Sequence, residues 1–492
     1  MAPASSLLHE IGESVVPLSG QDALLSLANH PLVHFYPNSR GSSDFMPTAV
    51  LKLALYMALR AFPLLVGRIQ DSGGGEASVV TEKGNLNMPE FVESASSVHW
   101  KDISDAHYCW DAWPDGVALA GPATAPGADG VVKLLNIHIV RLAENSGLIL
   151  FCNIPHYVLD GVGFYEFLGH WATLCRRHRG SEPASESPAF IFDRNVLKES
   201  LAGQRRPLEA STRELLTTTS MTARLLAWLS FAARTRLVAM AVRFDYGHGH
   251  FFHISPASMD ALQSLAVRHS PDGFELPSYA LLTALFRVAI SQAEQQKGSG
   301  GIAGRAVSAV ASLLGRLLPG KTSPHLLLSV VHSYELLSHI PGCYIGNNFC
   351  LHATYMPAEY PAECTDAEVF GSAAAQIACA MKDIDSAMVG EFHDTVCANR
   401  QAYANFSAGM SAMPCALTVI DERHYKTSSA DFGDGAPAWI SGLPRHTPNF
   451  IAYFVAPDHA GGGVNVYTSL KPAVFDKLLS NEFFTSYAKL LY

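Results

Sequence analysis

Residues 148–154, Leu-Ile-Leu-Phe-Cys-Asn-Ile, form an apolar run of strand length that leads into His156. The sequence His-Tyr-Val-Leu-Asp-Gly ends at Gly161, and beyond it apolar side chains recur at helical spacing, at Phe164, Phe167, Leu168, Trp171 and Leu174. This pattern predicts a buried strand, a turn and a helix. An imidazole at such a strand end faces a cleft in many α/β proteins and can accept a proton near neutral pH. His156 is therefore a candidate general base; the alternative is a core histidine without a catalytic role.

The His-x-x-x-Asp pattern alone is weak evidence, because with 21 histidines about one match is expected by chance. A second copy, from His107 to Asp111, follows a polar stretch and has no glycine after it. We expect His107 to be a loop or partly buried histidine, without a catalytic role. Whether His156 is a base therefore depends on the rest of the chain.

The chain has 492 residues, more than a single hydrophobic core usually serves. Strand and helix patterns alternate on both sides of residues 181–188, which are rich in proline and serine and form the best candidate linker. The sequence predicts an α/β fold with α+β layers. We expect a first domain at 1–185 that carries His156, a crossover at 186–245 and a second domain at 246–492.

Individual elements follow from the periodicity and from capping residues. In the first domain we expect a helix that contains Leu51, Leu55 and Leu59 and ends near Pro63, a strand at 64–69, and a hairpin of 131–142 with 148–154. In the second domain Ser255 as N-cap and Pro256 at the first helical position open a helix. Further helices are expected at 278–293 and 366–381, and strands at 251–254, 326–331, 350–355, 416–420, 450–455 and 464–469.

Composition excludes several classes of protein. A formal net charge of −10 argues against a nucleic-acid partner. The nine cysteines are scattered without a C-x-x-C pair, so we expect neither a disulfide framework nor a metal site. Glu10 and Glu13 interrupt an N-terminus that lacks the pattern of a secretory signal, and no apolar run is long enough to span a bilayer. We expect a cytoplasmic protein.

Several separated segments besides the His156 motif follow one another in a recognisable order. They are Pro17-Leu18-Ser19 with Asp22, residues 51–55 with Phe62-Pro63 and 66–69, residues 278–287, Tyr344-Ile345-Gly346-Asn347, Asp431-Phe432-Gly433-Asp434-Gly435, and residues 461–484. Together they resemble the BAHD family of coenzyme A-dependent acyltransferases and its fungal relatives. Each match is weak alone, but their common order spans nearly the whole chain.

The resemblance implies two similar domains of mixed sheet flanked by helices, arranged as in chloramphenicol acetyltransferase, with a tunnel between them. It implies that His156 is the base that deprotonates an acceptor hydroxyl, or less readily an amine, without an acyl-enzyme. Acyl-coenzyme A would be the co-substrate, delivering an acyl group such as acetyl, and no cofactor would be bound permanently. The acceptor would be a small, apolar, hydroxylated molecule, either a specialised metabolite or lipid-like, and the protein a monomer.

Other candidate site residues carry alternatives. Asp160 is either hydrogen-bonded to His156 or a structural carboxylate turned away from it, and the family uses its aspartate in the second way. Gly161 would give the backbone room and let substrate approach. Thr418 is a candidate oxyanion donor or an ordinary strand threonine, and Asn347 would hold the loop beside the tunnel. In the late motif, Asp431, Gly433 and Gly435 would form a structural loop remote from the chemistry.

The sequence departs from the family pattern at three places. Asp434 replaces a tryptophan of the late motif, and Ser333 and Glu335 stand where the family often has an arginine that pairs with the motif aspartate. Two stretches, 204–243 and 295–321, are enlarged and combine arginines with apolar residues. They are either helices packed on the second domain or a surface in weak contact with lipid or a greasy acceptor.

Two other functions stay open. A condensation-type domain of peptide synthesis shares the motif but usually has a second histidine before the first, where this chain has Pro155. A non-catalytic relative could bind a ligand in the tunnel. A serine hydrolase is disfavoured, because the chain has no Gly-x-Ser-x-Gly motif.

Overall fold

The computed structural model describes most of the chain. The described residues are 10–25, 29–73, 76–115, 130–183, 188–201, 203, 205–217, 246–270, 276–295, 326–337, 340–357, 363–399, 417–443, 445–456 and 462–492. Residues 222–244 and 302–318, the two arginine-containing apolar segments, both lie wholly outside them. Among the described residues, no helix combines the length and apolar composition that crossing a bilayer requires.

The first half of the chain builds a five-stranded sheet in the order β12-β2-β7-β6-β5. Its strands are β2 (Asn29–Pro37), β5 (Glu90–Ala95), β6 (Asn136–Arg141), β7 (Gly147–Pro155) and β12 (Trp439–Ser441). β6 and β7 pair antiparallel, which confirms the expected hairpin, although its first strand begins at Asn136 and not at Val131. All nine residues of β7 are buried, as its apolar sequence predicts.

Two helices cover this sheet and bury its apolar face. They are α3 (Thr48–Ala61) and α5 (Gly161–His178), and they pack on each other and on the sheet in one core. The expected strand at 64–69 is wrong in its first half, where η1 (Pro63–Val66) is a turn of 3-10 helix. Pro63 fixes φ and opens this turn at its first position, so the strand starts only after Gly67.

That later strand belongs to a small separate sheet, in the order β1-β4-β3. Its members are β1 (Ser14–Pro17), β3 (Arg68–Gly73) and β4 (Glu76–Thr81). Short elements connect the larger ones: α2 (Gly20–Leu24), α4 (Trp100–Asp105), η2 (Trp110–Ala112), η3 (Ala143–Asn145), α6 (Asn195–Ser200), α7 (Ala210–Thr217) and η5 (Thr427–Ser429).

The second half builds an eight-stranded sheet in the order β10-β9-β11-β14-β15-β8-β13, with the last strand, β16, also paired to β8. The strands are β8 (Tyr246–Ile254), β9 (Leu326–His332), β10 (Phe349–Tyr355), β11 (Leu417–Asp421), β13 (His446–Pro448), β14 (Ile451–Val455), β15 (Val464–Leu470) and β16 (Ala488–Leu490). The strands expected in this half are therefore confirmed. Their bounds match the expected ones or differ from them by up to five residues.

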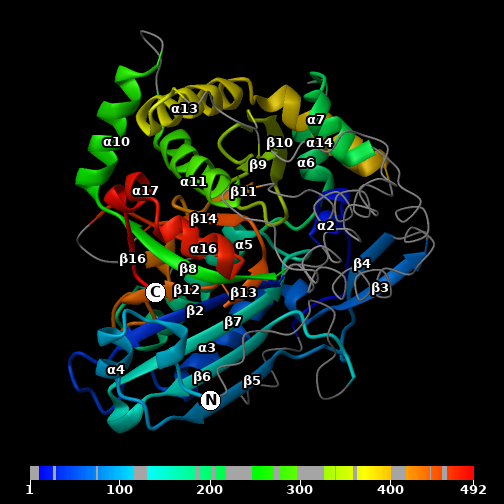
Figure 1. Cartoon of the computed structure of the whole chain (residues 1–492). Helices are drawn as coiled ribbons and strands as arrows, with labels where there is room; N and C mark the ends of the chain where they lie inside the picture. The colour runs from blue at the N-terminus through cyan, green and yellow to red at the C-terminus, as the bar shows by residue number, and fades with distance from the viewer. Residues whose placement is uncertain are drawn as a thin grey trace.

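Helices cover one face of the second sheet (Figure 1). They are α10 (Pro256–Arg268), α11 (Ser278–Gln295), α13 (Asp366–Lys382), α16 (Pro472–Leu479) and α17 (Glu482–Tyr487), whereas α14 (Ser386–Ala398) packs with α7 on the other face, against β9 and β10. Ser255 caps α10 by accepting a hydrogen bond from the Ser258 N–H at 3.1 Å, as expected from the sequence. The expected helices at 278–293 and 366–381 are confirmed by α11 and α13.

One segment of the second half crosses to the first sheet. After β11 the chain leaves the second sheet, and β12 pairs antiparallel with β2 in the first (Figure 1). An aromatic cluster fills the junction, with Phe35 and Trp439 from the first sheet and Phe251 and Tyr467 from the second. The crossing places residues 425–435 against α5, close to the turn that carries His156.

Candidate active site

The turn between β7 and α5 holds His156. β7 ends at Pro155, whose carbonyl accepts a hydrogen bond from the Val158 N–H at 2.9 Å, and α5 begins at Gly161. His156 keeps partial exposure to solvent although protein surrounds its ring. The base predicted from sequence is therefore placed at a strand end and is not sealed inside the core.

Asp160 is the N-cap of α5 and points away from His156. Its Oδ1 accepts a hydrogen bond from the Gly163 N–H at 2.9 Å, and its Oδ2 accepts from the Tyr334 hydroxyl at 3.1 Å and the Asn348 N–H at 3.2 Å. Burial raises the pKa of Asp160 to about 6, and these hydrogen bonds oppose that rise. The structure thus has the second arrangement expected from the sequence, a carboxylate that fixes the turn.

Asn347 is a hydrogen-bond partner of the His156 imidazole. Its Oδ1 lies 3.2 Å from His156 Nδ1, while its Nδ2 donates to Asp22 Oδ1 at 2.7 Å and to the His156 carbonyl at 2.8 Å. Because both contacts of Nδ2 are acceptors, the orientation of the amide is fixed. Oδ1 must therefore accept a hydrogen from Nδ1, which leaves the lone pair of the imidazole on Nε2.

The surroundings keep this imidazole neutral and able to take a proton. Burial lowers the pKa of His156, whereas the hydrogen bond to Asn347 and the negative charge of Asp22 raise it. The neutral form is the one that a general base needs. The carboxylate behind Asn347 would stabilise the imidazolium that forms when the base takes a proton.

Asp22 is fully buried and pairs with Arg194, whose Nε lies 3.0 Å from its Oδ2. The Arg194 guanidinium also donates to the carbonyls of Ile345 at 2.6 Å and Val158 at 2.9 Å, so it joins the turn around His156 to the loop before Asn347. A buried charge pair needs such additional hydrogen bonds to offset the cost of desolvation.

Sequence reasoning missed Arg194 and Tyr334. The cation that the family places near Ser333 and Glu335 is supplied from the crossover, and it binds Asp22 and not Asp160. Tyr334, which stands between those two positions, makes the direct contact with Asp160. The only available signal was the Ser-x-x-Asp pattern at Asp22, which forms a capping box with Ser19.

Two other candidate residues lie apart from each other. Gly161 begins α5 directly after this turn, whereas Thr418 belongs to the second sheet. A Cβ at Gly161 would meet the Tyr425 ring at 2.2 Å, so the close approach that needs glycine is made by a side chain of the protein itself. Thr418 lies on β11 with its hydroxyl buried. Its role as an oxyanion donor stays a prediction.

Residues 5–225 match the model of a family described as the Transferase family. The resemblance to the BAHD family is confirmed. Among solved structures, F. graminearum TRI101 complexed with ethyl coenzyme A is 16% identical over 98% of this chain and 100% of that one, with a TM-score of 0.68. A search among curated proteins found no match.

Two further structures show the same fold. F. sporotrichioides TRI101 complexed with coenzyme A and T-2 is 14% identical, covers 97% of this chain and 100% of its own, and has a TM-score of 0.69. Vinorine synthase is 15% identical, with 97% and 98% covered and a TM-score of 0.60. The expected fold, two domains of mixed sheet and helices arranged as in chloramphenicol acetyltransferase, is confirmed. The tunnel between the domains stays a prediction.

The late BAHD motif forms a loop that is closed on itself. Asp431 Oδ1 accepts hydrogen bonds from the N–H groups of Gly433 at 2.7 Å and Gly435 at 3.0 Å, and both glycines have positive φ, 106° and 113°. Phe432 anchors the loop by packing on Trp171 of α5, with ring centroids 4.9 Å apart. The loop therefore depends on its own residues for its shape.

Asp434 replaces the tryptophan of the BAHD motif and makes a different contact. Its carboxylate pairs with Arg179 at the end of α5 and accepts a hydrogen bond from the Met46 N–H at 2.9 Å. An ion pair thus holds the loop to the first domain at the position where the family uses an apolar ring.

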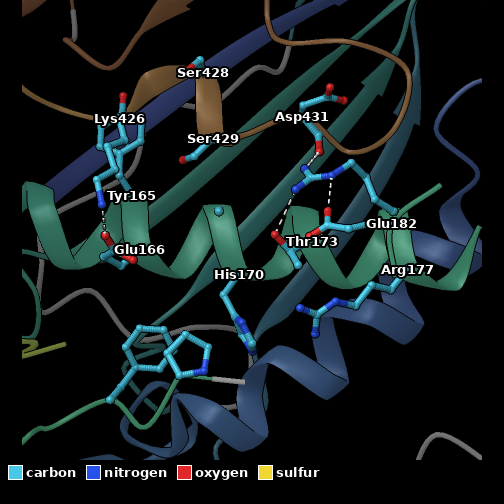
Figure 2. A pocket seen from close by; sticks show the side chains of 14 residues that line it. Tyr165, Glu166, His170, Thr173, Arg177, Glu182, Lys426, Ser428, Ser429 and Asp431 are labelled. Atoms are coloured by element: carbon cyan, nitrogen blue, oxygen red, sulfur yellow. Dashed lines mark hydrogen bonds and ion pairs between the residues drawn. The ribbon is translucent and has the colours of Figure 1, made fainter. Parts of the chain in front are cut away.

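A polar cavity of about 580 Å³ lies along α5 beside this loop, and His156 does not line it. Figure 2 shows Lys426, Ser429 and Asp431 on one side of the helix and His170 and Arg177 on the other. Four of its charged side chains pair within the wall, Lys426 with Glu166 at 2.9 Å and Arg176 with Glu182 at 2.7 Å. The cavity therefore belongs to the structural loop and not to the candidate base.

Proposed function

We propose that the protein is an acyl-coenzyme A-dependent acyltransferase that acylates a hydroxyl group of a specialised-metabolite or lipid-like acceptor, with His156 as general base. One observation carries this proposal. The His156 imidazole is partly exposed, and Asn347 holds it with Nδ1 protonated, so that Nε2 can accept a proton. The fold around it is that of TRI101, whose structures contain coenzyme A and hydroxylated acceptors.

The reaction would proceed in one complex of the protein with both substrates. His156 Nε2 takes the hydroxyl proton while the acceptor oxygen attacks the thioester carbonyl and forms the new C–O bond. The tetrahedral intermediate then breaks its C–S bond, and the imidazolium returns the proton to the departing thiolate. A positioned base of this kind contributes roughly 10²–10⁴-fold to the rate. No side chain of the protein is acylated.

Acyl-coenzyme A would reach His156 through a tunnel between the two sheets, and the acceptor would enter from the opposite side. Two residues that hold the turn in place support this use of the site. Asp160 holds the start of α5, and Arg194 ties the turn to the second half of the chain, so the imidazole has a fixed direction. Transfer to an amine would use the same base, but attack by an alcohol depends more strongly on removal of its proton than attack by an amine does.

Release of free thiol tests the proposal. Acetyl-coenzyme A and longer acyl-coenzyme A donors would be incubated with the trichothecenes deoxynivalenol and T-2 toxin, with other polyhydroxylated metabolites and with long-chain alcohols. We expect acceptor-dependent thiol release with at least one acceptor. Absence of transfer to every acceptor, or transfer only from donors tethered to a carrier protein, would contradict it.

Two matched substitutions locate the base. His156→Asn should lower kcat by roughly 10²-fold or more, because asparagine cannot accept the proton. His107→Asn makes the same change in the other His-x-x-x-Asp segment, where the residue is exposed and has φ 52°, a value that asparagine tolerates. That variant should keep full activity. Equal activity of the two variants would refute the assignment, provided that both melt at the wild-type temperature.

A further inference from the structure

Glu422 directly follows the C-terminal end of β11 and lies on the sheet face opposite α11 and α13. Side chains alternate along this strand. Val419 packs in the core under α11, and Asp421 holds Arg423, which reaches Ser278 at the start of α11. The Glu422 N–H continues the ladder to the Phe454 carbonyl at 2.8 Å, so its side chain lies on the other face.

That face adjoins the turn of His156. Val330 of β9 and Ile420 of β11 lie side by side in these parallel strands. His332 and Glu422 each follow two residues later, so they are also neighbours, on strands about 4.8 Å apart. The Tyr425 hydroxyl lies 3.4 Å from His332 Nε2, and the Tyr425 ring packs on Gly161. His332 is also close enough to His156 for the two rings to influence each other electrostatically.

Polar groups on this face lack partners. Within the described residues, the Glu422 carboxyl makes neither a hydrogen bond nor an ion pair, although the neighbouring Asp421 binds Arg423 through both oxygens at 2.8 and 2.5 Å. Thr418 Oγ1 and His332 Nδ1 are fully buried, and they too have no partner among these residues. Buried polar groups are normally satisfied, so a cluster of unsatisfied ones beside the candidate base indicates a polar ligand.

The charge state of Glu422 indicates which chemical groups of a ligand this carboxyl can bind. The titratable groups around it are Asp421, Tyr425 and Tyr453, with His332 and His424 next to Tyr425. Burial and then the charge of Asp421 raise the pKa of Glu422 to about 8. Burial lowers the pKa of both histidines, so neither supplies a cation. A neutral carboxyl both donates and accepts a hydrogen bond.

We propose that Glu422 determines acceptor specificity by hydrogen-bonding a second oxygen of the acceptor, a hydroxyl or a carbonyl, while His156 acts on the reacting hydroxyl. The inference rests on the proposed acyltransferase function. It makes the acceptor a neutral molecule with several oxygen atoms and not a simple lipid alcohol. Glu422 keeps partial exposure, as an acceptor-binding group requires, and Thr418 and His332 offer further hydrogen bonds on the same face.

Steady-state kinetics test this with two substitutions of similar size. The probes are the polyoxygenated acceptor and the long-chain alcohol with the highest kcat/KM in the thiol-release panel. Glu422→Met should raise KM for the polyoxygenated acceptor about tenfold, because one satisfied hydrogen bond is lost, and leave KM for acyl-coenzyme A unchanged. Glu422→Gln, which still donates and accepts, should stay within about threefold of wild type at pH 7. Glu335→Gln, the same change at an exposed glutamate, is the control.

Each of the other results would contradict the proposed role of Glu422 or the function on which it rests. An unchanged acceptor KM in Glu422→Met, or an enzyme that acylates only simple alcohols, would overturn the inference while leaving the acyltransferase function intact. A KM in Glu422→Gln as high as in Glu422→Met would show that a negative charge is recognised, which would make the acceptor an amine cation. Failure of the parent function is recognised separately, because no acceptor would then release thiol in the wild type.

Discussion

Replacing Glu422 with glutamine should make the free energy of unfolding less dependent on pH. The pKa of this carboxyl is raised from 4.5 to about 8 by burial. Between these values the folded protein holds a proton that the unfolded chain has lost, so stability must fall as pH rises. Each pH unit costs about 1.4 kcal/mol. From pH 5.5 to 7.5 the carboxyl therefore removes about 3 kcal/mol, a loss that a glutamine cannot cause.

Thermal melting of the two proteins at several pH values measures this difference. For a unit of about 250 residues, the length of the second half of the chain, about 3 kcal/mol corresponds to a relative shift of roughly 6–12 °C in Tm. Wild type and Glu422→Gln should melt closest together near pH 5, with the variant increasingly more stable up to pH 8. Glu335→Gln should follow the wild type throughout. A constant difference between wild type and Glu422→Gln across this range would refute the assigned burial of the carboxyl.

Three further substitutions test the groups around the base. Asn347→Ala should lower kcat roughly tenfold with little change in KM for acyl-coenzyme A, because the imidazole loses the acceptor that fixes its tautomer; an unchanged kcat would refute this role. Asp160→Asn should reduce stability in urea by about 1–3 kcal/mol, because an amide cannot accept all three hydrogen bonds; lost activity at full stability would instead make Asp160 a catalytic group. Arg194→Met should cost about 3–5 kcal/mol by leaving Asp22 buried without a cation, and a loss under about 1 kcal/mol would show that this pair is dispensable.

Local patterns in the sequence predicted the elements that local physics determines. The strand, turn and helix around His156 follow from an apolar run, a glycine and a helical repeat, and α10 follows from a serine cap with proline after it. Pro63 was the exception. It was expected only to end a helix, but it also opens a 3-10 turn that delays the next strand.

Long-range contacts could not be predicted in the same way. β12 is three residues long, too short for a periodic pattern, and its pairing with β2 depends on the path of the whole chain. Arg194 follows two phenylalanines in the crossover, where nothing in the sequence relates it to Asp22, 172 positions away. Asn347 was expected in a loop near the tunnel, but only the fold shows that its amide oxygen faces His156.

The direction of the His156 imidazole depends on both halves of the chain. His156 and Asp22 belong to the first half, whereas Asn347 lies between β9 and β10 of the second sheet. Arg194 binds carbonyls on both sides, Val158 beside the base and Ile345 before Asn347. If the halves moved apart, Nδ1 would lose its acceptor and Asp22 one of its donors. The tautomer that leaves Nε2 able to take a proton is therefore fixed only when the two halves are docked.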